Sequence, residues 1–213
     1  MRGLVLALMM VGGFAGAVQG QAVSDAPAGN YTLDLGHARL LFRASHLGFS
    51  NYTALFTKFE AQLVFDPVAP EAMKVAVQVD PTSVETHYPD PSIDFNAVIE
   101  GPEFLDAAAY PVMQFVSTGV VVTGADTADV TGDLTLHGVT KPMVLAVRFN
   151  GGYAGHPMDP GGARIGFSAT GVLLRSEFGM GFGIPAPGTT LGVSDRVEVI
   201  VEAEFLNPDA AKP

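Results

Sequence analysis

Apolar and polar residues alternate along most of the chain from Tyr31 onward, and clusters of glycine, proline, asparagine and aspartate separate the alternating runs. A period of two is typical of antiparallel strands that bury one face. In 37–46 one face carries Leu40, Phe42, Ala44 and His46. The runs 58–67 and 73–81 each end in Asp-Pro and carry these same-face residues: Phe59, Ala61, Leu63 and Phe65, then Met73, Val75, Val77 and Val79.

The alternation resumes in the second half of the chain, where we expect strands over 111–124, 128–138, 141–152, 163–175 and 195–205. The last four of these strands have the following same-face sets: Val130, Leu134 and Leu136; Met143, Leu145, Val147 and Phe149; Phe167, Ala169 and Leu173; and Val197, Val199, Val201, Ala203 and Phe205.

The segment between these two groups of strands breaks the alternation. Ser92 is a candidate N-cap for a helix over 92–101, which would end at Gly101 and Pro102. Pro102 also suits the first turn of a second helix over 102–109. We therefore predict a short helical insertion over about 92–108.

Strands in succession with one helical insertion define an all-β protein, and two architectures remain: a closed barrel and a two-sheet sandwich. Several residues on the predicted inner face are small, namely Ala44, Ala61, Ala169 and Ala203. Small inward residues favour a barrel with interior space over a filled interior, but the pattern alone does not show that the barrel closes.

The beginning of the chain has the layout of a secretory signal peptide. Arg2 precedes an apolar run from Leu4 to Val11, and small residues follow. We expect residues 1–20 to be removed, with cleavage after Ala17 or Gly20, and the alternative is a buried N-terminal helix. The remaining residues, 21–213, are predicted to form a single domain in the periplasm.

Composition excludes several classes of function. The chain contains no cysteine, so disulfides, thiol chemistry and cysteine-bound metals are excluded. Its formal net charge of −11 argues against a nucleic-acid partner and against electrostatic docking on anionic lipid.

Short segments distributed over 30–205 resemble the YceI-like family of secreted, lipocalin-like proteins associated with polyisoprenoid lipids. No segment is specific alone, but they occur in the family's order. They are Tyr31, Asp34 and His37; Phe42 and His46; Phe56 and Phe59; Phe65-Asp66-Pro67; SVET at 83–86; EFLDAAAYP at 103–111 with Phe115; GDLTLHGVTKP at 132–142; and RSEFGMG at 175–181.

The resemblance implies an extended, lipocalin-like barrel of about eight antiparallel strands, with a long apolar tunnel for a prenyl chain, a helix beside its mouth, and a homodimer. The chain departs from the family's pattern at Ala38, Ala54, Asn96 and Val98, which affects polar contacts at the mouth more than the tunnel. The residues predicted to line the tunnel are Leu40, Phe42, Ala44, Phe59, Leu63, Val75, Val77, Met113, Phe115, Leu134, Leu136, Leu145, Val147, Phe167, Ala169, Leu173, Val199 and Val201.

Two polar residues are candidates for contacting the head group of such a lipid. His46 ends an apolar face, where it is either a satisfied, partly buried imidazole or a hydrogen-bond partner of the head group. Arg175 ends the inward series of its strand, so it either pairs with Glu177, Asp34 or another acid, or donates to a phosphate. His137 precedes Gly138 between two strands and is interpreted as a turn residue rather than a ligand.

The chain has no motif typical of catalysis or of a compact metal site. Its five histidines stand apart, and the serine of the SVET segment, Ser83, has no adjoining base. This lack of a catalytic motif predicts a non-enzymatic protein that needs no cofactor. The resemblance to the YceI-like family implies that it transports or sequesters an isoprenoid lipid or quinone, with transient membrane contact. Two alternatives remain: an enzyme or enzyme accessory acting on a prenylated or quinone substrate, and an interaction domain with a dry core.

Overall fold

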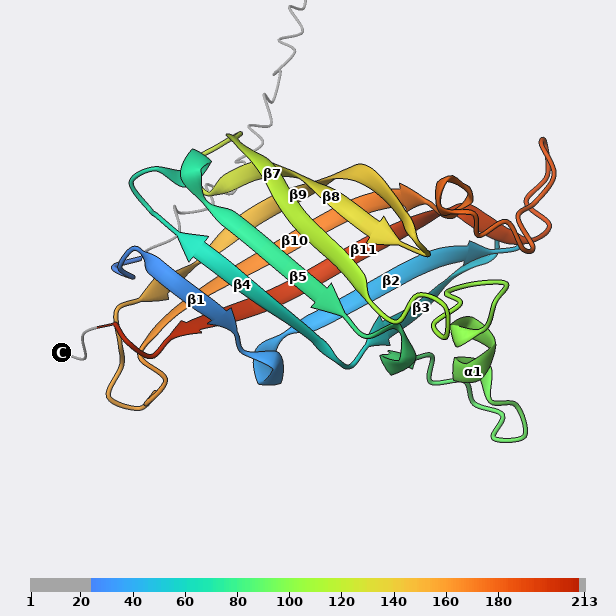
Figure 1. Cartoon of the computed structure of the whole chain (residues 1–213), viewed down its shortest axis with the longest axis horizontal. Helices are drawn as coiled ribbons and strands as arrows, with labels where there is room; N and C mark the ends of the chain where they lie inside the picture. Colours follow the sequence, from blue (N-terminus) through green and yellow to red (C-terminus); the bar gives the residue numbers. More distant parts are fainter. Residues whose placement is uncertain (1–23, 211–213) are drawn as a thin grey trace, which may run out of the picture.

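A computed structural model describes residues 24–210, and eight antiparallel strands in this part of the chain form a closed ring (Figure 1). The signal-peptide prediction lies outside the described residues. The prediction of an all-β barrel of about eight strands is confirmed. In ring order the strands are β1 (Gly29–Leu33), β4 (Phe59–Phe65), β5 (Lys74–Val79), β7 (Met113–Val122), β8 (Thr127–Leu136), β9 (Val139–Tyr153), β10 (Ala163–Leu174) and β11 (Val193–Asn207).

Strand β11 closes the ring because its two halves have different neighbours on one edge. Its second half pairs with β1, where Phe205 faces Leu33. Its first half pairs with β2 (Arg39–His46), where Val201 faces Leu40. β3 (Ser50–Phe56) and β6 (Val84–Glu85) follow β2, so these three strands extend the wall at one end of the barrel.

The buried side chains form two clusters along the barrel. The first surrounds Tyr31, Phe65, Ile165 and Phe205. The second, which we call the plug, fills the end that carries β2, β3 and β6. The buried members of the plug are Phe56, Val79, Val84, Met113, Leu136, Phe178 and Met180.

The helical insertion is shorter than predicted. Helix α1 (Phe95–Glu100) begins at Asp94, whose carboxylate accepts from the Ala97 N–H at 3.0 Å, so the N-cap is not Ser92. The predicted second helix is wrong, since 102–109 forms turns. Its backbone bonds back onto α1 at Glu100 and Gly101, and Asp106 takes a left-handed φ of 43°. A helix of eight residues would have few internal hydrogen bonds, so the turn conformation that bonds to the end of α1 is more stable.

Short connections complete the chain. The described part of the chain has four 3₁₀ turns: η1 (Leu35–His37), η2 (Pro70–Ala72), η3 (Pro81–Ser83) and η4 (Arg175–Phe178). His137 and Gly138 join β8 to β9 with φ values of 51° and 74°, as a two-residue hairpin with the strand twist requires. The interpretation of His137 as a turn residue is confirmed, and its Nδ1 also hydrogen-bonds the Phe178 carbonyl at 2.9 Å. Within 24–210, no helix has the length and apolar character needed to cross a bilayer.

Candidate functional site

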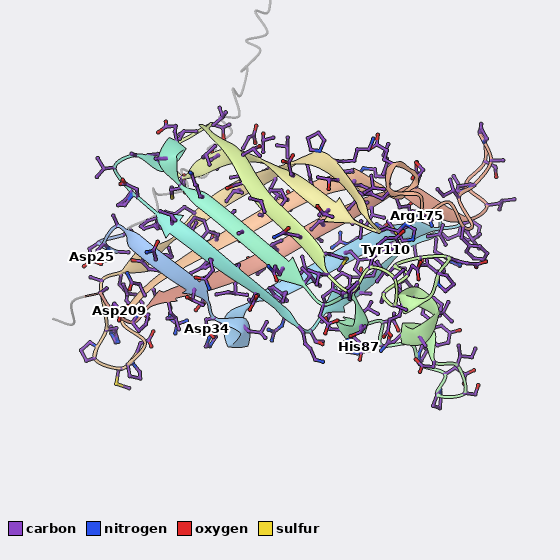
Figure 2. The ribbon with its side chains drawn as sticks, viewed as in Figure 1. Asp25, Asp34, His87, Tyr110, Arg175 and Asp209 are labelled. Atoms are coloured by element: carbon purple, nitrogen blue, oxygen red, sulfur yellow. The ribbon has the colours of Figure 1, made fainter. Side chains whose placement is uncertain are left out.

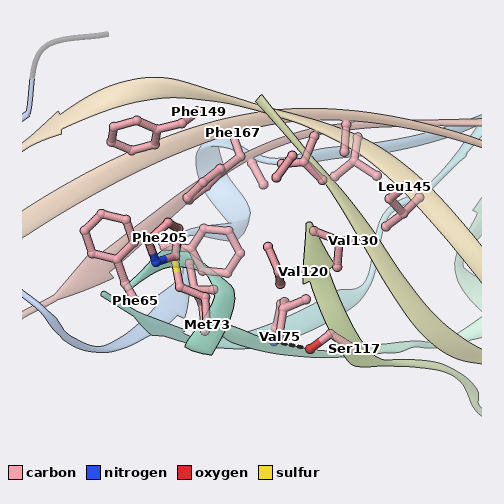
Figure 3. Close-up of a pocket in the computed structure, with 18 of the residues that line it drawn as sticks. Phe65, Met73, Val75, Ser117, Val120, Val130, Leu145, Phe149, Phe167 and Phe205 are labelled. Carbon is pink, nitrogen blue, oxygen red and sulfur yellow. Dashed lines mark hydrogen bonds between the residues drawn. The ribbon is translucent and has the colours of Figure 1, made fainter. Parts of the chain in front are cut away.

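A cavity of about 410 Å³ lies inside the barrel, beside the first cluster (Figure 3). Some of its lining residues also pack against the plug. Four phenylalanines make one part of its wall: Phe65, Phe149, Phe167 and Phe205. Their ring centroids lie 5.3 Å apart for Phe149 and Phe167 and 6.1 Å apart for Phe167 and Phe205. These rings come from β4, β9, β10 and β11, so ring closure creates the aromatic wall.

Aliphatic side chains make the rest of the wall. Alanines provide space between the larger residues: of the small inward residues that the pattern identified, Ala61, Ala169 and Ala203 line the cavity, whereas Ala44 does not. The aliphatic residues of the wall include Leu63, Val75, Val77, Val120, Val130, Leu145, Val147 and Val201. Such a surface binds apolar groups without directional preference.

Few polar groups reach the cavity, and the side chains of Ser117 and Asp126 among them have partners. The Ser117 hydroxyl accepts from the Val75 N–H at 2.9 Å (Figure 3). Asp126 lies at the rim, where Arg148 binds its carboxylate at 3.4 Å. Lys74 borders the cavity but is exposed and alternates with the inward Val75. The cavity can therefore hold an apolar chain, whereas a polar head would remain at the rim.

The rim consists of loops and of an incomplete seam between two strands. Pro67 and Pro70 lie in the β4–β5 connection, and Gly124 and Ala125 lie in the β7–β8 hairpin. β5 pairs with β7 only over Ala76–Val79. Beyond that point the Ser117 side chain takes the place of a main-chain acceptor, so the strand ladder is incomplete here.

The structure places the predicted tunnel residues in two different environments. One group lines the cavity: Leu40, Phe59, Leu63, Val75, Val77, Phe115, Leu145, Val147, Phe167, Ala169 and Val201. A second group is part of the plug or packs against it: Phe42, Met113, Leu134, Leu136 and Leu173. Ala44 and Val199 lie on the β2–β11 pair outside the cavity wall. The open space therefore occupies one part of the barrel rather than its full length.

The two head-group candidates do not approach the cavity. His46 is exposed at the end of β2, opposite Val193. Arg175 is buried at 4% exposure in η4, away from Asp25 and Asp209 at the other end of the molecule (Figure 2).

The buried guanidinium of Arg175 donates to the carbonyls of Phe182, Val193 and Ser194 at 2.7–2.9 Å. Burial lowers the pKa of Arg175. The expected ion pair with Glu177 or Asp34 is wrong, because main-chain oxygens take the guanidinium and Asp34 binds Arg164 at 2.8 Å. The acid that acts electrostatically on Arg175 is Asp195, which partly offsets the effect of burial on the Arg175 pKa.

Sequence reasoning missed several residues of the wall, most clearly Phe65, Phe149 and Phe205. All three belong to same-face sets that the alternating pattern had already identified. The pattern could have found them if the predicted tunnel had included the last member of each set. The loop residues of the rim carry no comparable signal, because their position depends on closure of the barrel.

A polar network closes the barrel near β1. Arg164 binds Asp34, Asp159 and Glu204, and Tyr153 also donates to Asp159. Hydrogen bonds from Arg164 and then Tyr153 lower the pKa of Asp159 well below its ordinary value. Asp34, His37 and Glu204 offer ligand atoms within 4.8 Å of one another, but the Arg164 guanidinium already binds both carboxylates. We therefore interpret the group as an ion-pair network.

The family model for the YceI-like domain matches residues 31–205. The chain belongs to the YceI-like family. A UPF0312 protein of Pseudomonas savastanoi pv. phaseolicola is 41% identical over 172 residues, covering 79% of this chain and 83% of the relative. A UPF0312 protein of Pseudomonas putida strain W619 is 38% identical over 195 residues, covering 89% and 95%.

Solved structures with the same fold include a YceI protein of Campylobacter jejuni and BcnA of Burkholderia cenocepacia. The first is 29% identical with a TM-score of 0.64 and covers 76% of this chain and 89% of its own. BcnA is 24% identical with a TM-score of 0.66 and covers 81% and 98%. A polyisoprenoid-binding domain from Saccharophagus degradans is 17% identical with a TM-score of 0.56 and covers 84% and 98%. The lipocalin-like barrel is therefore a property of the family.

Proposed function

We propose that this YceI-like protein is an exported, non-enzymatic protein that binds an isoprenoid lipid or quinone in its barrel and carries or stores it in the periplasm. The observation that carries the proposal is the apolar cavity of about 410 Å³, with its wall of phenylalanine and aliphatic side chains. The polyisoprenoid-binding domain of Saccharophagus degradans has the same fold, which supports this choice of ligand.

The energetics of such a cavity suit exchange with membranes. Each methylene group that leaves water contributes about 0.8 kcal/mol. A prenyl lipid in a bilayer is already out of water, so the free-energy change for its transfer from the bilayer into an apolar cavity is close to zero. Loading and release then depend on contact between the rim and the membrane.

Exposed valines near the rim support transient membrane contact. Val68 in the β4–β5 connection is 91% exposed, and Val121 near the β7–β8 hairpin is 63% exposed. The next residue, Val122, lines the cavity itself. An apolar chain that leaves a bilayer between these loops would pass directly from one apolar surface to another.

The two alternatives make different demands on the structure. A dry-core domain requires inward side chains to fill the barrel, but the cavity remains unfilled. An enzyme requires a group that can transfer a proton or attack a substrate. Among the described residues of the wall, Ser117 is held by Val75, and no adjoining base activates it. No observation favours catalysis.

The test is mass spectrometry of lipids extracted from protein purified without detergent from the periplasm. We expect about one prenyl lipid or quinone per molecule of wild type. Ala169→Trp should fold and lose this lipid, because Ala169 lines the cavity. Val172→Trp is the matched control, since Val172 lies on the same strand with an exposed side chain. Protein that is empty and takes up no prenyl lipid from vesicles would contradict the proposal.

The same purification tests two further predictions. Recovery of a shortened chain from the periplasm would support export and cleavage after Ala17 or Gly20. Light scattering of that material measures the oligomeric state, for which the family resemblance predicts a homodimer.

A further inference from the structure

The plug is the floor of the cavity. Leu40, Phe59 and Val77 line the cavity on one side and pack against the plug on the other. Behind them, the rings of Phe42 and Phe56 lie with their centroids 5.5 Å apart.

Residues from outside the β2–β3 wall fill the remaining space behind this floor. Phe178 and Met180, in and after η4, are 2% and 6% exposed. Val84 of β6 is 3% exposed. Packed interiors of this kind leave few voids larger than a water molecule. An apolar chain that enters from the rim therefore stops at the floor unless these side chains rearrange.

The cavity volume sets the length of chain that fits above the floor. A cavity of about 150 Å³ accommodates benzene, which corresponds to roughly 25 Å³ per carbon atom. At that ratio the cavity of about 410 Å³ takes roughly sixteen carbon atoms. Three isoprene units contain fifteen carbons, so a chain of about three units fills the space.

We propose that the cavity selects a short prenyl chain of about three isoprene units, and that Phe59, with Leu40 and Val77, is the residue that sets this limit. The inference rests on the proposed function and adds the class of lipid. The chain end contacts the floor, and the polar head lies at the rim, near Ser24, Asp126 and Thr127. A longer chain leaves its additional units outside the cavity, where a bilayer solvates them better.

The direct test uses delipidated wild-type protein and three alcohols: farnesol with three isoprene units, geranylgeraniol with four, and solanesol with nine. Each is supplied in phosphatidylcholine vesicles, and bound alcohol is measured by native mass spectrometry after the vesicles are removed. We expect farnesol to be retained at least about tenfold better than geranylgeraniol, and solanesol to be retained least.

The floor is tested with Phe59→Ala, which removes the six ring carbons and lets a fourth isoprene unit enter. In this variant the preference for farnesol over geranylgeraniol should fall by about tenfold or reverse. Phe49→Ala removes the same ring from a residue that is 83% exposed and should leave the preference unchanged. Leu40→Ala is the second floor variant, for use if Phe59→Ala does not fold.

The outcomes separate this inference from the proposed function. If wild type retains none of the three alcohols, the proposed function is wrong. If wild type retains solanesol as well as farnesol, lipid binding stands and the length limit is overturned. If the limit holds but both floor variants keep the wild-type preference, the assignment of Phe59 and Leu40 is overturned.

Discussion

Arg175 is a buried cation that binds main-chain oxygens instead of a carboxylate. Its three bonds tie the loop at Phe182 to the start of β11 at Val193 and Ser194. We expect Arg175→Met to lower the free energy of unfolding by about 3 kcal/mol, because three buried carbonyls lose their donors. Urea denaturation measures this loss.

The lipid content of Arg175→Met distinguishes a structural role from a head-group role. Arg175 does not line the cavity, so molecules that remain folded should keep their lipid. Arg196→Met is the control for removing a cation, since Arg196 is exposed on the same strand as Val193. A stably folded Arg175→Met protein without lipid would show that the arginine contacts the ligand.

Asp159 gives folding stability a specific dependence on pH. Hydrogen bonds from Arg164 and Tyr153 hold the pKa of Asp159 below its ordinary value, so the folded state binds this proton less readily than the unfolded state. The resulting stability is complete above the unfolded pKa of about 3.9 and is lost as the pH falls towards the folded pKa. We expect Asp159→Asn to be less stable than wild type from pH 7 to about 5, with the difference shrinking below about pH 4.

The measurement is the urea midpoint of both proteins between about pH 2 and 7. Asp34 also binds Arg164 and makes its own acid-sensitive contribution to stability. That contribution is present in wild type and in Asp159→Asn, so it cancels when the two midpoints are compared. Asp129→Asn, at an exposed position of β8, controls for the loss of one negative charge. A difference that stays constant down to pH 2 would contradict the assigned cause.

At the scale of elements, the seam between β5 and β7 is a place where the strand ladder in the cavity wall is incomplete. The Ser117 hydroxyl is the acceptor for the Val75 N–H at the point where the strand ladder ends. We expect Ser117→Ala to speed lipid exchange about fivefold, because one hydrogen bond contributes about 1 kcal/mol. The rate of transfer of a fluorescent prenyl lipid to vesicles measures this effect.

Thr118→Ala is a suitable control for Ser117→Ala, because Thr118 is the next residue of β7 and its hydroxyl bonds Thr131 on the exposed outer face. Exchange should keep the wild-type rate in this variant. An unchanged rate in Ser117→Ala as well would show that lipid does not pass through the seam.

The alternating pattern predicted the strands and their inner faces, because side-chain direction in a strand is a local property. It could not predict which inner faces border open space. Leu40 and Phe42 share one face of β2, yet the pairing of Leu40 with Val201 puts it on the cavity wall, whereas Phe42 packs against the plug. That difference depends on long-range register. The prediction that Arg175 contacts the head group assumed that the strand alternation continues to this residue. Strand β10 ends at Leu174 and η4 begins at Arg175, so the alternation no longer gives the direction of this side chain.

For the whole molecule, the unequal filling of the barrel explains how one fold combines stability with binding. The plug supplies a packed core that does not depend on ligand. Around the cavity, the polar network of Arg164 and the pairing of strand β1 stabilise the barrel wall. A ligand can therefore leave the cavity without removing the contacts that keep the barrel closed.

The net charge of the whole chain predicts how lipid uptake depends on membrane composition. A formal charge of −11 repels an anionic bilayer, whereas contact through Val68 and Val121 does not depend on charge. At low salt the screening length is about 30 Å, so the whole charge acts, and at about 1 M it falls to about 3 Å. We expect several-fold slower uptake of farnesol from vesicles with a third of anionic lipid than from phosphatidylcholine at low salt, and equal uptake at high salt. Faster uptake from the anionic vesicles at low salt would contradict docking through apolar contact, because it requires a local cationic surface at the rim.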